Sequence, residues 1–164
     1  MLDLPSDVAI GDPGLLADHL LGPEPRETSE VVGLVPHYVD VDLAITAQLG
    51  TRDGWVVIDP RDDVTRVVRS IAACEAVLSS SLHGLVVADA LGVPNRWLPL
   101  LNRIVGGDFK FRDYYSVFGL GAEKASVDDL GADSADLVDS IACGYRRPGI
   151  DDIRRRIHDA FPFA

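Results

Sequence analysis

Hydrophobic residues in the first two thirds of the chain fall into short runs, separated by segments with the spacing of amphipathic helices. Runs of this length, bounded by polar residues, are typical of strands that are buried on both faces of a parallel sheet. The expected strands are residues 31–35, 55–58, 76–80 and 95–100. Their ends recur about every twenty residues, which suits repeated βαβ units with right-handed crossovers. The pattern predicts an α/β fold with a parallel, Rossmann-like sheet and helices on both faces.

The segments between these strands predict the helices. Helices are expected at residues 40–49, after Asp62 or Asp63, and at residues 84–91, the last being apolar on nearly every side. A short strand is expected at residues 7–10, followed by a short helix that Asp12 caps and Pro13 begins. A helical carboxyl-terminal segment at about 133–161, capped by Asp133 or Ser134, follows a core at about 7–121. We therefore expect residues 1–164 to form a single α/β domain.

Composition narrows the classes of partner. The chain has 164 residues, 47% of them hydrophobic, which suffices for one substantial core. Its net charge of −11 argues against nucleic acids and anionic membrane surfaces as partners, because these require basic surface. The amino terminus does not resemble a signal peptide, and no apolar run approaches the length of a membrane span. We expect a cytoplasmic protein without an integral membrane segment.

The two cysteines, Cys74 and Cys143, lie in apolar surroundings without the spacing of metal ligands. Buried free thiols in a reducing compartment are the expected state of both. The sequence therefore predicts no metal site, and we expect no cofactor.

Candidate chemistry is concentrated between Cys74 and Pro94, in CEAVLSSSLHGLVVADALGVP. Three serines and a histidine lie where a strand gives way to a helix; they are Ser79, Ser80, Ser81 and His83. In parallel sheets, ligands bind beyond the carboxyl ends of strands, where the next helix offers unpaired N–H groups to an anion. These residues are candidates for a phosphate or carboxylate site. Alternatively, the serines are ordinary helix caps and His83 is structural.

Three further residues are candidates for the same edge of the sheet. His37 and Arg61 follow the strands at 31–35 and 55–58, and a guanidinium can pair bidentately with a phosphate or carboxylate. Lys110 follows Gly106 and Gly107 in what we expect to be a loop that could close over an anion. Each has a simpler interpretation: His37 as a solvent-facing loop residue, Arg61 as a surface residue among aspartates, and Lys110 as part of an amphipathic connector.

The segment SSSLHGLVVADALGVPN resembles the signature of the polysaccharide pyruvyl transferase family, which includes exopolysaccharide ketal-pyruvyl transferases. Further segments resemble that family's later blocks in the same order: GDPGLLADHL at 11–20, VGLVPHYVD at 32–40, VVIDPRDDV at 56–64 and FKFRDYYSVFG at 109–119. The resemblance implies a fold similar to the carboxyl-terminal domain of a two-domain GT-B-type transferase. In that family the turn equivalent to Gly11–Gly14 faces a cleft between two halves; alternatively, it is only a turn here. The family's amino-terminal half is absent from these 164 residues.

The resemblance also implies a reaction: transfer of a pyruvyl group from phosphoenolpyruvate to a sugar of an exopolysaccharide or cell-surface polysaccharide, as a ketal. His83 is the implied acid/base catalyst, because a histidine titrates near neutrality. The implied substrate-binding residues are Ser79, Ser80, Ser81, Arg61, Lys110 and His37. Some relatives have Arg where this chain has Ser81, so another cation must supply that charge here. The implied partners are phosphoenolpyruvate, a saccharide acceptor and an amino-terminal domain or second chain.

Two other classes of protein remain alternatives. A nucleotide-sugar glycosyltransferase would share the carboxyl-terminal fold, although no Glu-rich nucleotide-ribose motif is evident. A half-domain that is non-catalytic, or that depends on a partner, would carry every motif and do nothing alone, because a cleft enzyme without its opposite wall cannot position both reactants.

Overall fold

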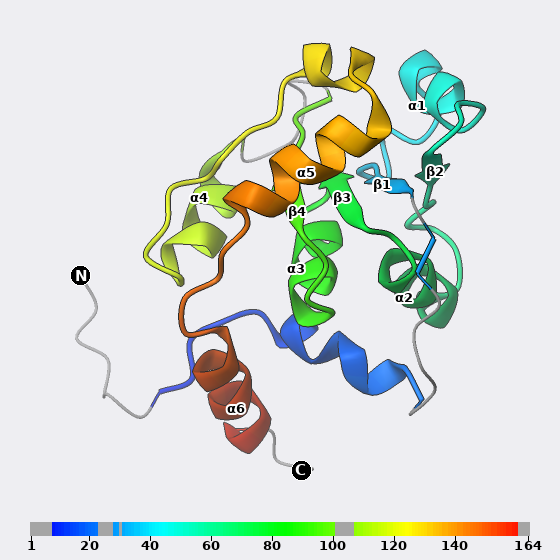
Figure 1. Ribbon diagram of the computed structural model, residues 1–164. Helices are drawn as coiled ribbons and strands as arrows, with labels where there is room; N and C mark the ends of the chain where they lie inside the picture. The colour runs from blue at the N-terminus through cyan, green and yellow to red at the C-terminus, as the bar shows by residue number, and fades with distance from the viewer. Residues whose placement is uncertain (1–7, 23–27, 30, 101–106, 161–164) are drawn as a thin grey trace.

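Four parallel strands form one sheet in the order β2-β1-β3-β4 in the computed structural model (Figure 1). The structure describes residues 8–22, 28–29, 31–100 and 107–160. The strands are β1 (Val32–Val35), β2 (Trp55–Val57), β3 (Ala76–Ser79) and β4 (Asn95–Trp97). Val32 pairs with both Trp55 and Ala76, and Val77 pairs with Asn95, so β1 and β3 are the interior strands. The predicted parallel α/β sheet is confirmed, and β3 is one of its two interior strands.

The strand order reverses between β1 and β3. From β1 the chain passes to β2 on one side, then crosses back to β3 on the other side and continues to β4. The carboxyl ends of β1 and β3 therefore lie together at the switch point, which is where α/β sheets bind their ligands.

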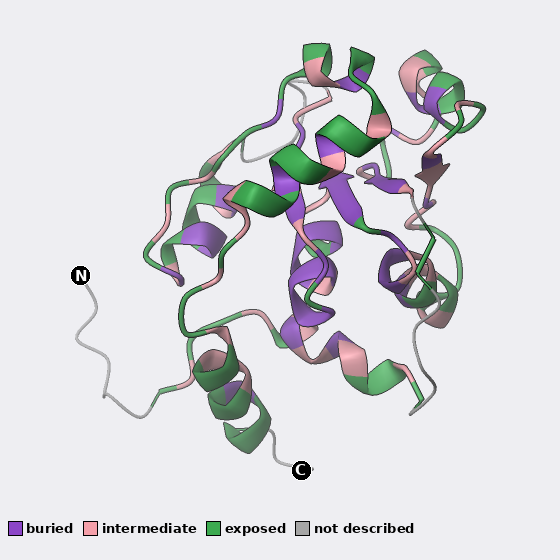
Figure 2. Cartoon of the chain, in the orientation of Figure 1, coloured by how far each residue is buried: buried purple, intermediate pink, exposed green. Residues whose placement is uncertain are grey.

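Helices cover both faces of the sheet, as the strand pattern predicts. On one face α2 (Val64–Ala72) and α3 (Leu82–Ala90) pack against Val35 and Val77. The opposite face is covered by α1 (Ala44–Leu49), the 3-10 helix η2 (Val127–Gly131) and α5 (Ser134–Gly144). Figure 1 shows α5 crossing the strands on the side away from α2 and α3. Figure 2 shows α3 buried along almost its whole surface, in agreement with its apolar sequence.

A third hydrophobic cluster joins the first and last parts of the described chain. It contains side chains of the 3-10 helix η1 (Pro13–Leu20), α3, β4, α4 (Phe109–Ser116) and α6 (Ile150–Ala160). Trp97 of β4 stacks on Phe111 of α4, with ring centroids 4.1 Å apart and an interplanar angle of 11°. The helices α4 and α6 thus pack against η1, α3 and β4.

Aspartate side chains cap the amino ends of three helices where the sequence predicts helix starts. Asp12 accepts a hydrogen bond from the N–H of Gly14, with Pro13 at the first helical position. Asp63 caps α2, and Asp133 caps α5. These local signals predict the starts of three helices correctly.

Some predicted elements are wrong in extent. Residues 8–10 form no strand, and residue 7 lies outside the described residues. The predicted helix at 40–49 begins only at Ala44, because residues 38–42 form turns in which the N–H of Asp40 donates to the carbonyl of His37. The strand predicted at 95–100 ends at Trp97. Cys74 is a buried free thiol as expected, but Cys143 is exposed, because α5 turns that side away from the sheet.

The segment around Lys110 is a helix and not a loop. Residues Phe109–Ser116 form α4, with Phe111, Tyr114 and Tyr115 buried. The aromatic residues at helical spacing supply an apolar face that packs on β4 and α3. Gly106 lies outside the described residues, and Gly107 adopts a left-handed conformation (φ +52°) before the helix.

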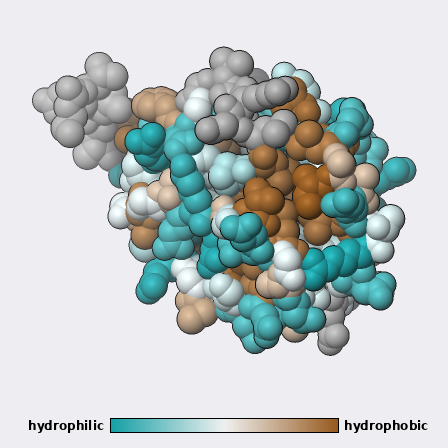
Figure 3. Space-filling model, turned by 90° about the horizontal axis from the view of Figure 1, so that it is seen from above, coloured by the Kyte–Doolittle hydropathy of each residue, from teal (hydrophilic) through white to brown (hydrophobic). Residues whose placement is uncertain are grey.

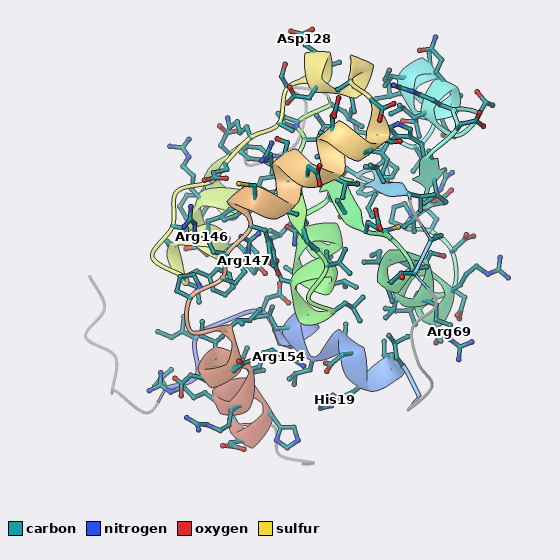
Figure 4. All side chains as sticks on the ribbon, in the orientation of Figure 1. His19, Arg69, Asp128, Arg146, Arg147 and Arg154 are labelled. Atoms are coloured by element: carbon teal, nitrogen blue, oxygen red, sulfur yellow. The ribbon has the colours of Figure 1, made fainter. Side chains whose placement is uncertain are left out.

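A buried polar cluster connects α3, β4, α4 and the segment after α5. The carboxylate of Asp89 accepts hydrogen bonds from Nε of Arg147 (2.7 Å), the hydroxyl of Tyr114 (2.6 Å) and the amide of Asn95. Arg147 also donates to Asn95 and lies 4.9 Å from the ring centroid of Tyr115. Figure 4 shows Arg147 directed inward, beside the outer Arg146. Because Asn95 begins β4 and Asp89 lies near the end of α3, this cluster is at the amino edge of the sheet.

Among the described residues, no helix is long and apolar enough to cross a membrane.

Candidate functional site

Hydrogen bonds join the carboxyl ends of β1 and β3 at the switch point. The hydroxyl of Ser80 accepts from the N–H of His37 (2.7 Å) and donates to Oδ2 of Asp40 (2.7 Å). The N–H of Ser80 donates to the carbonyl of Val35. These bonds fix the segment after β1 against the segment after β3, so that His37 lies next to the turn that carries the serines.

Ser79 and Ser80 are fully buried, and their hydroxyls bond within the protein. The hydroxyl of Ser79 lies 2.7 Å from the carbonyl of Val35 and accepts from the N–H of Ser81 (3.0 Å). Gly84 allows this close packing, because a Cβ there would lie 2.3 Å from Oγ of Ser79. The two serines predicted as ligand contacts thus build the turn in this structure, whereas Ser81 is partly exposed.

His83 lies in the first turn of α3, and its side chain is 78% exposed. The helix begins after Ser81, whose side chain makes no capping bond. The first N–H groups of a helix have no intrahelical acceptor, so they remain available to an anion at this position. The arrangement suits a phosphate or carboxylate held beside an ionisable imidazole.

The sequence interpretation missed that Asp12 lies beside His83. Oδ2 of Asp12 is 3.7 Å from Nε2 of His83, while Oδ1 holds the cap of η1. The signal was present, because the Gly-Asp-Pro-Gly turn precedes a helix that contacts α3. Sequence spacing alone could not show the pairing, since 71 positions separate the two residues.

His37 and Lys110 interact electrostatically, although they lie far apart in the sequence. Partial burial and the Lys110 ammonium lower the pKa of His37 from its ordinary value of 6.5, and the Asp40 carboxylate opposes them. Burial also lowers the pKa of Lys110. The structure thus brings together two of the predicted substrate-binding residues, one after β1 and the other on α4.

Arg61 lies beyond the end of β2 and pairs with carboxylates of the protein. Its guanidinium contacts Asp59 through Nε and Nη2 (2.7 Å) and reaches Asp42 at 3.6 Å. Hydrogen bonding to Asp59 raises the pKa of Arg61, and the same bonds lower the pKa of Asp59. Arg61 therefore has the geometry of a surface arginine among aspartates, and a ligand would have to compete with these partners.

The described part of the chain also has an apolar groove, which lies away from these residues. A groove of about 530 Å³ runs between η1, α2, α3 and α6, and its lining includes Leu16, Val68 and Val87 with His19 and His158. Hydrophobic side chains also gather on the face seen from above in Figure 3. None of the predicted site residues lines the groove. Within the described part of the chain, no group of three His, Cys, Asp or Glu side chains could hold a metal ion.

Fold and site together define an α/β protein with a candidate anion-binding turn at the switch point of a parallel sheet. Two histidines in different environments follow the carboxyl ends of the interior strands β1 and β3. His83 is exposed beside a carboxylate, and His37 is partly buried near a lysine. Such a pair suits chemistry that moves protons on an anionic ligand.

Comparison with known proteins agrees with this class. The family model for polysaccharide pyruvyl transferase matches residues 9–100, which contain η1, the whole sheet and the switch point. The chain belongs to the polysaccharide pyruvyl transferase family.

Two curated relatives are much longer than this chain. An uncharacterized protein of Acanthamoeba polyphaga mimivirus is 37% identical over 121 residues, which cover 70% of this chain and 42% of that protein. The succinoglycan biosynthesis protein ExoV of Rhizobium meliloti is 29% identical over 86 residues, 52% of this chain and 27% of its own length. The chain thus spans less than half the length of either relative. No solved structure matches significantly.

Proposed function

We propose that this protein takes part in transferring a pyruvyl group from phosphoenolpyruvate to a sugar of an exopolysaccharide or cell-surface polysaccharide, where it forms a ketal. The observation that carries the proposal is the position of His83. It is exposed in the first turn of α3, after a serine that leaves the helix uncapped, at the switch point of the sheet. Family membership and the likeness to a succinoglycan biosynthesis protein support the same reaction.

The roles follow from the chemistry of phosphoenolpyruvate, which carries a phosphate, a carboxylate and an enol double bond. Ser81 and the first N–H groups of α3 hold one anionic group, and Lys110 pairs with the other. His83 delivers a proton to the methylene carbon, and Asp12 faces its ring. Ser79 and Ser80 shape the turn that presents these groups. Arg61 joins the site only by exchanging its carboxylate partners for the ligand.

We propose further that the site is completed by another half, as in a GT-B-type arrangement, supplied by an amino-terminal domain or a second chain. The two relatives' additional length supports this. A protein with a net charge of −11 repels a small anion, and accurate placement of both reactants is worth orders of magnitude in rate. The chain alone should therefore bind phosphoenolpyruvate weakly and show no turnover. A cytoplasmic location belongs to this proposal as well.

A titration of phosphoenolpyruvate followed by amide NMR tests the proposal. In the wild type, the amide signals of residues 81–84 should shift most. His83→Ala should weaken binding about tenfold or more, because it removes a charge-assisted contact. His158→Ala is the matched control, since His158 is also exposed and lies 3.5 Å from a carboxylate oxygen of Asp159.

Two outcomes would contradict the proposal. One is an equal loss of binding in the His83 and His158 variants. The other is tighter binding of a nucleotide sugar than of phosphoenolpyruvate, which would favour a glycosyltransferase domain.

A further inference from the structure

The carboxylate of Asp40 is fully buried at the edge of the sheet that carries the candidate site. Its Oδ2 accepts the hydroxyl of Ser80, whereas Oδ1 has no hydrogen-bond partner among the described residues. The backbone of Asp40 is held as firmly, because its N–H donates to the carbonyl of His37 (2.7 Å) and its carbonyl accepts from Thr46 (3.0 Å). Burying a carboxylate without full hydrogen bonding costs free energy of folding, so we expect Asp40 to have a function at this position.

Ser80 connects this carboxylate to His37. A hydroxyl has one proton to donate, and that of Ser80 goes to Asp40, so its oxygen is oriented to accept the N–H of His37. Asp40 therefore holds His37 by two routes, one through Ser80 and one through its own N–H. The route through Ser80 crosses from the segment after β1 to the end of β3, and this sets His37 relative to the serine turn. The other route keeps the turn after β1 closed.

We propose that Asp40 is a positioning residue for His37, and that His37 is the group that takes a proton from the acceptor sugar's hydroxyl. The chemical part of this inference rests on the proposed pyruvyl transfer. The positioning of His37 by Asp40 does not, and it can be measured on the chain itself.

The proton balance of the reaction requires such a group. The methylene carbon of phosphoenolpyruvate gains one proton from His83. The first sugar oxygen bonds to the adjacent carbon, and the proton of that sugar hydroxyl passes to His37. The carbon–oxygen bond to phosphate then breaks, the second sugar oxygen takes its place, and the second proton leaves with the phosphate. The products are the pyruvate ketal and inorganic phosphate. One donor and one acceptor are needed, and His83 alone cannot be both at the same moment.

The charges around His37 suit an acceptor. Lys110 faces it from α4 and Asp40 lies on its own segment, while the ring of Tyr38 lies 4.5 Å away and Ser80 is uncharged. Burial and Lys110 lower the pKa of His37 from its ordinary value, and both favour the neutral ring. Asp40 acts in the opposite direction and stabilises the imidazolium once a proton arrives.

Histidine NMR titrations of the whole chain test this inference. The chain has four histidines, so His37→Gln identifies the signal by its loss. Asp40→Asn keeps the size and an oxygen that can accept the hydroxyl of Ser80, but removes the charge. We expect it to move the titration midpoint of His37 to lower pH. Lys110→Met should move the midpoint to higher pH. Asp42→Asn is the matched control: its side chain is 87% exposed and pairs with Arg61, so the midpoint of His37 should stay in place.

Ser80→Ala separates positioning from charge. It leaves the Asp40 carboxylate in place but breaks the bond to the N–H of His37, so hydrogen exchange at that amide should accelerate severalfold. This variant also keeps the test decisive if Asp40→Asn does not fold. An unchanged His37 midpoint in folded Asp40→Asn, or unchanged exchange in Ser80→Ala, would overturn the positioning role. A His37 ring that is protonated at pH 7 in the wild type would overturn the acceptor role. Failure of phosphoenolpyruvate to bind the wild type would instead count against the proposed function.

Discussion

The two edges of the sheet use charged residues in opposite ways. At the amino edge, Asp89 and Arg147 are buried, with side-chain exposures of 0% and 6%, and bond to each other. At the carboxyl edge, His83 is 78% exposed, and His37 and Lys110 are only partly buried. The first cluster is closed, because its groups are satisfied by the protein. The second is open, because groups that prefer a charged or polar partner still face solvent.

This difference shows why clustering of ionisable residues does not by itself identify a site. The amino-edge cluster has an aspartate, an arginine and tyrosines whose pKa values burial raises, that of Tyr115 to about 12. Such shifts often mark functional sites, but structural networks also produce them. What distinguishes the carboxyl edge is the uncapped start of α3 and the buried, half-satisfied carboxylate of Asp40.

Removing Arg147 should have the largest effect on stability. Arg147→Ala leaves the buried carboxylate of Asp89 without its counter-ion, which should lower the free energy of unfolding by about 3–5 kcal/mol. Urea denaturation followed by circular dichroism measures this. Arg146→Ala, at an exposed neighbouring position, should change it by less than about 0.5 kcal/mol. Similar losses in both variants would remove the contrast between the two edges.

A smaller loss should follow from crowding the carboxyl edge. Gly84→Ala would place a Cβ 2.3 Å from Oγ of Ser79 and 2.9 Å from Cγ1 of Val35. We expect the free energy of unfolding to fall by about 1–3 kcal/mol, because buried overpacking forces neighbours to shift. Gly121→Ala is the control, since nothing lies within 4 Å of its added Cβ. Thermal denaturation compares the two, and a Gly84→Ala protein as stable as the control would show that the serine turn is loosely packed.

The smallest effect should be a pH dependence that comes from His37. Its pKa is lower in the folded protein than the ordinary 6.5, so the unfolded chain binds the proton more readily. The stabilisation is fully present above pH 6.5 and is lost as the pH falls from there toward the folded value. Denaturation of the wild type and of His37→Gln across this range measures the contribution. A stability difference between them that does not change with pH would contradict a pKa of His37 that is lowered in the folded protein.

Local sequence patterns predicted much of the fold. The runs at residues 31–35 and 76–78 contain no polar side chain, and such runs are typical of strands that are buried on both faces of a sheet. The caps at Asp12, Asp63 and Asp133 were predictable because a cap depends on contacts within a few residues. The helix at Phe109–Ser116 was not predicted, because the burial of its aromatic residues depends on their packing against β4.

The sequence predicted the edge of the sheet at which the candidate residues lie, but not the partners of their side chains. Topology alone puts His37 and His83 at one edge, because parallel strands end together. The environments of Ser80 and Arg61 depend on partners that are distant in the sequence. Ser80 bonds to Asp40, and Arg61 pairs with Asp42 in addition to the nearby Asp59. Likewise, neither Asp12 nor Lys110 lies near its histidine in the sequence.

The sequence by itself determined the strand and helix order, the motif that places this chain in its family, and the location of the serine turn between β3 and α3. These features follow from hydrophobic periodicity and local hydrogen bonding. Only the tertiary structure decided which polar groups are satisfied internally and which remain open to a ligand. Satisfaction of a buried polar group depends on distance and direction to a partner, and these are set by how β1, β3 and α4 pack together.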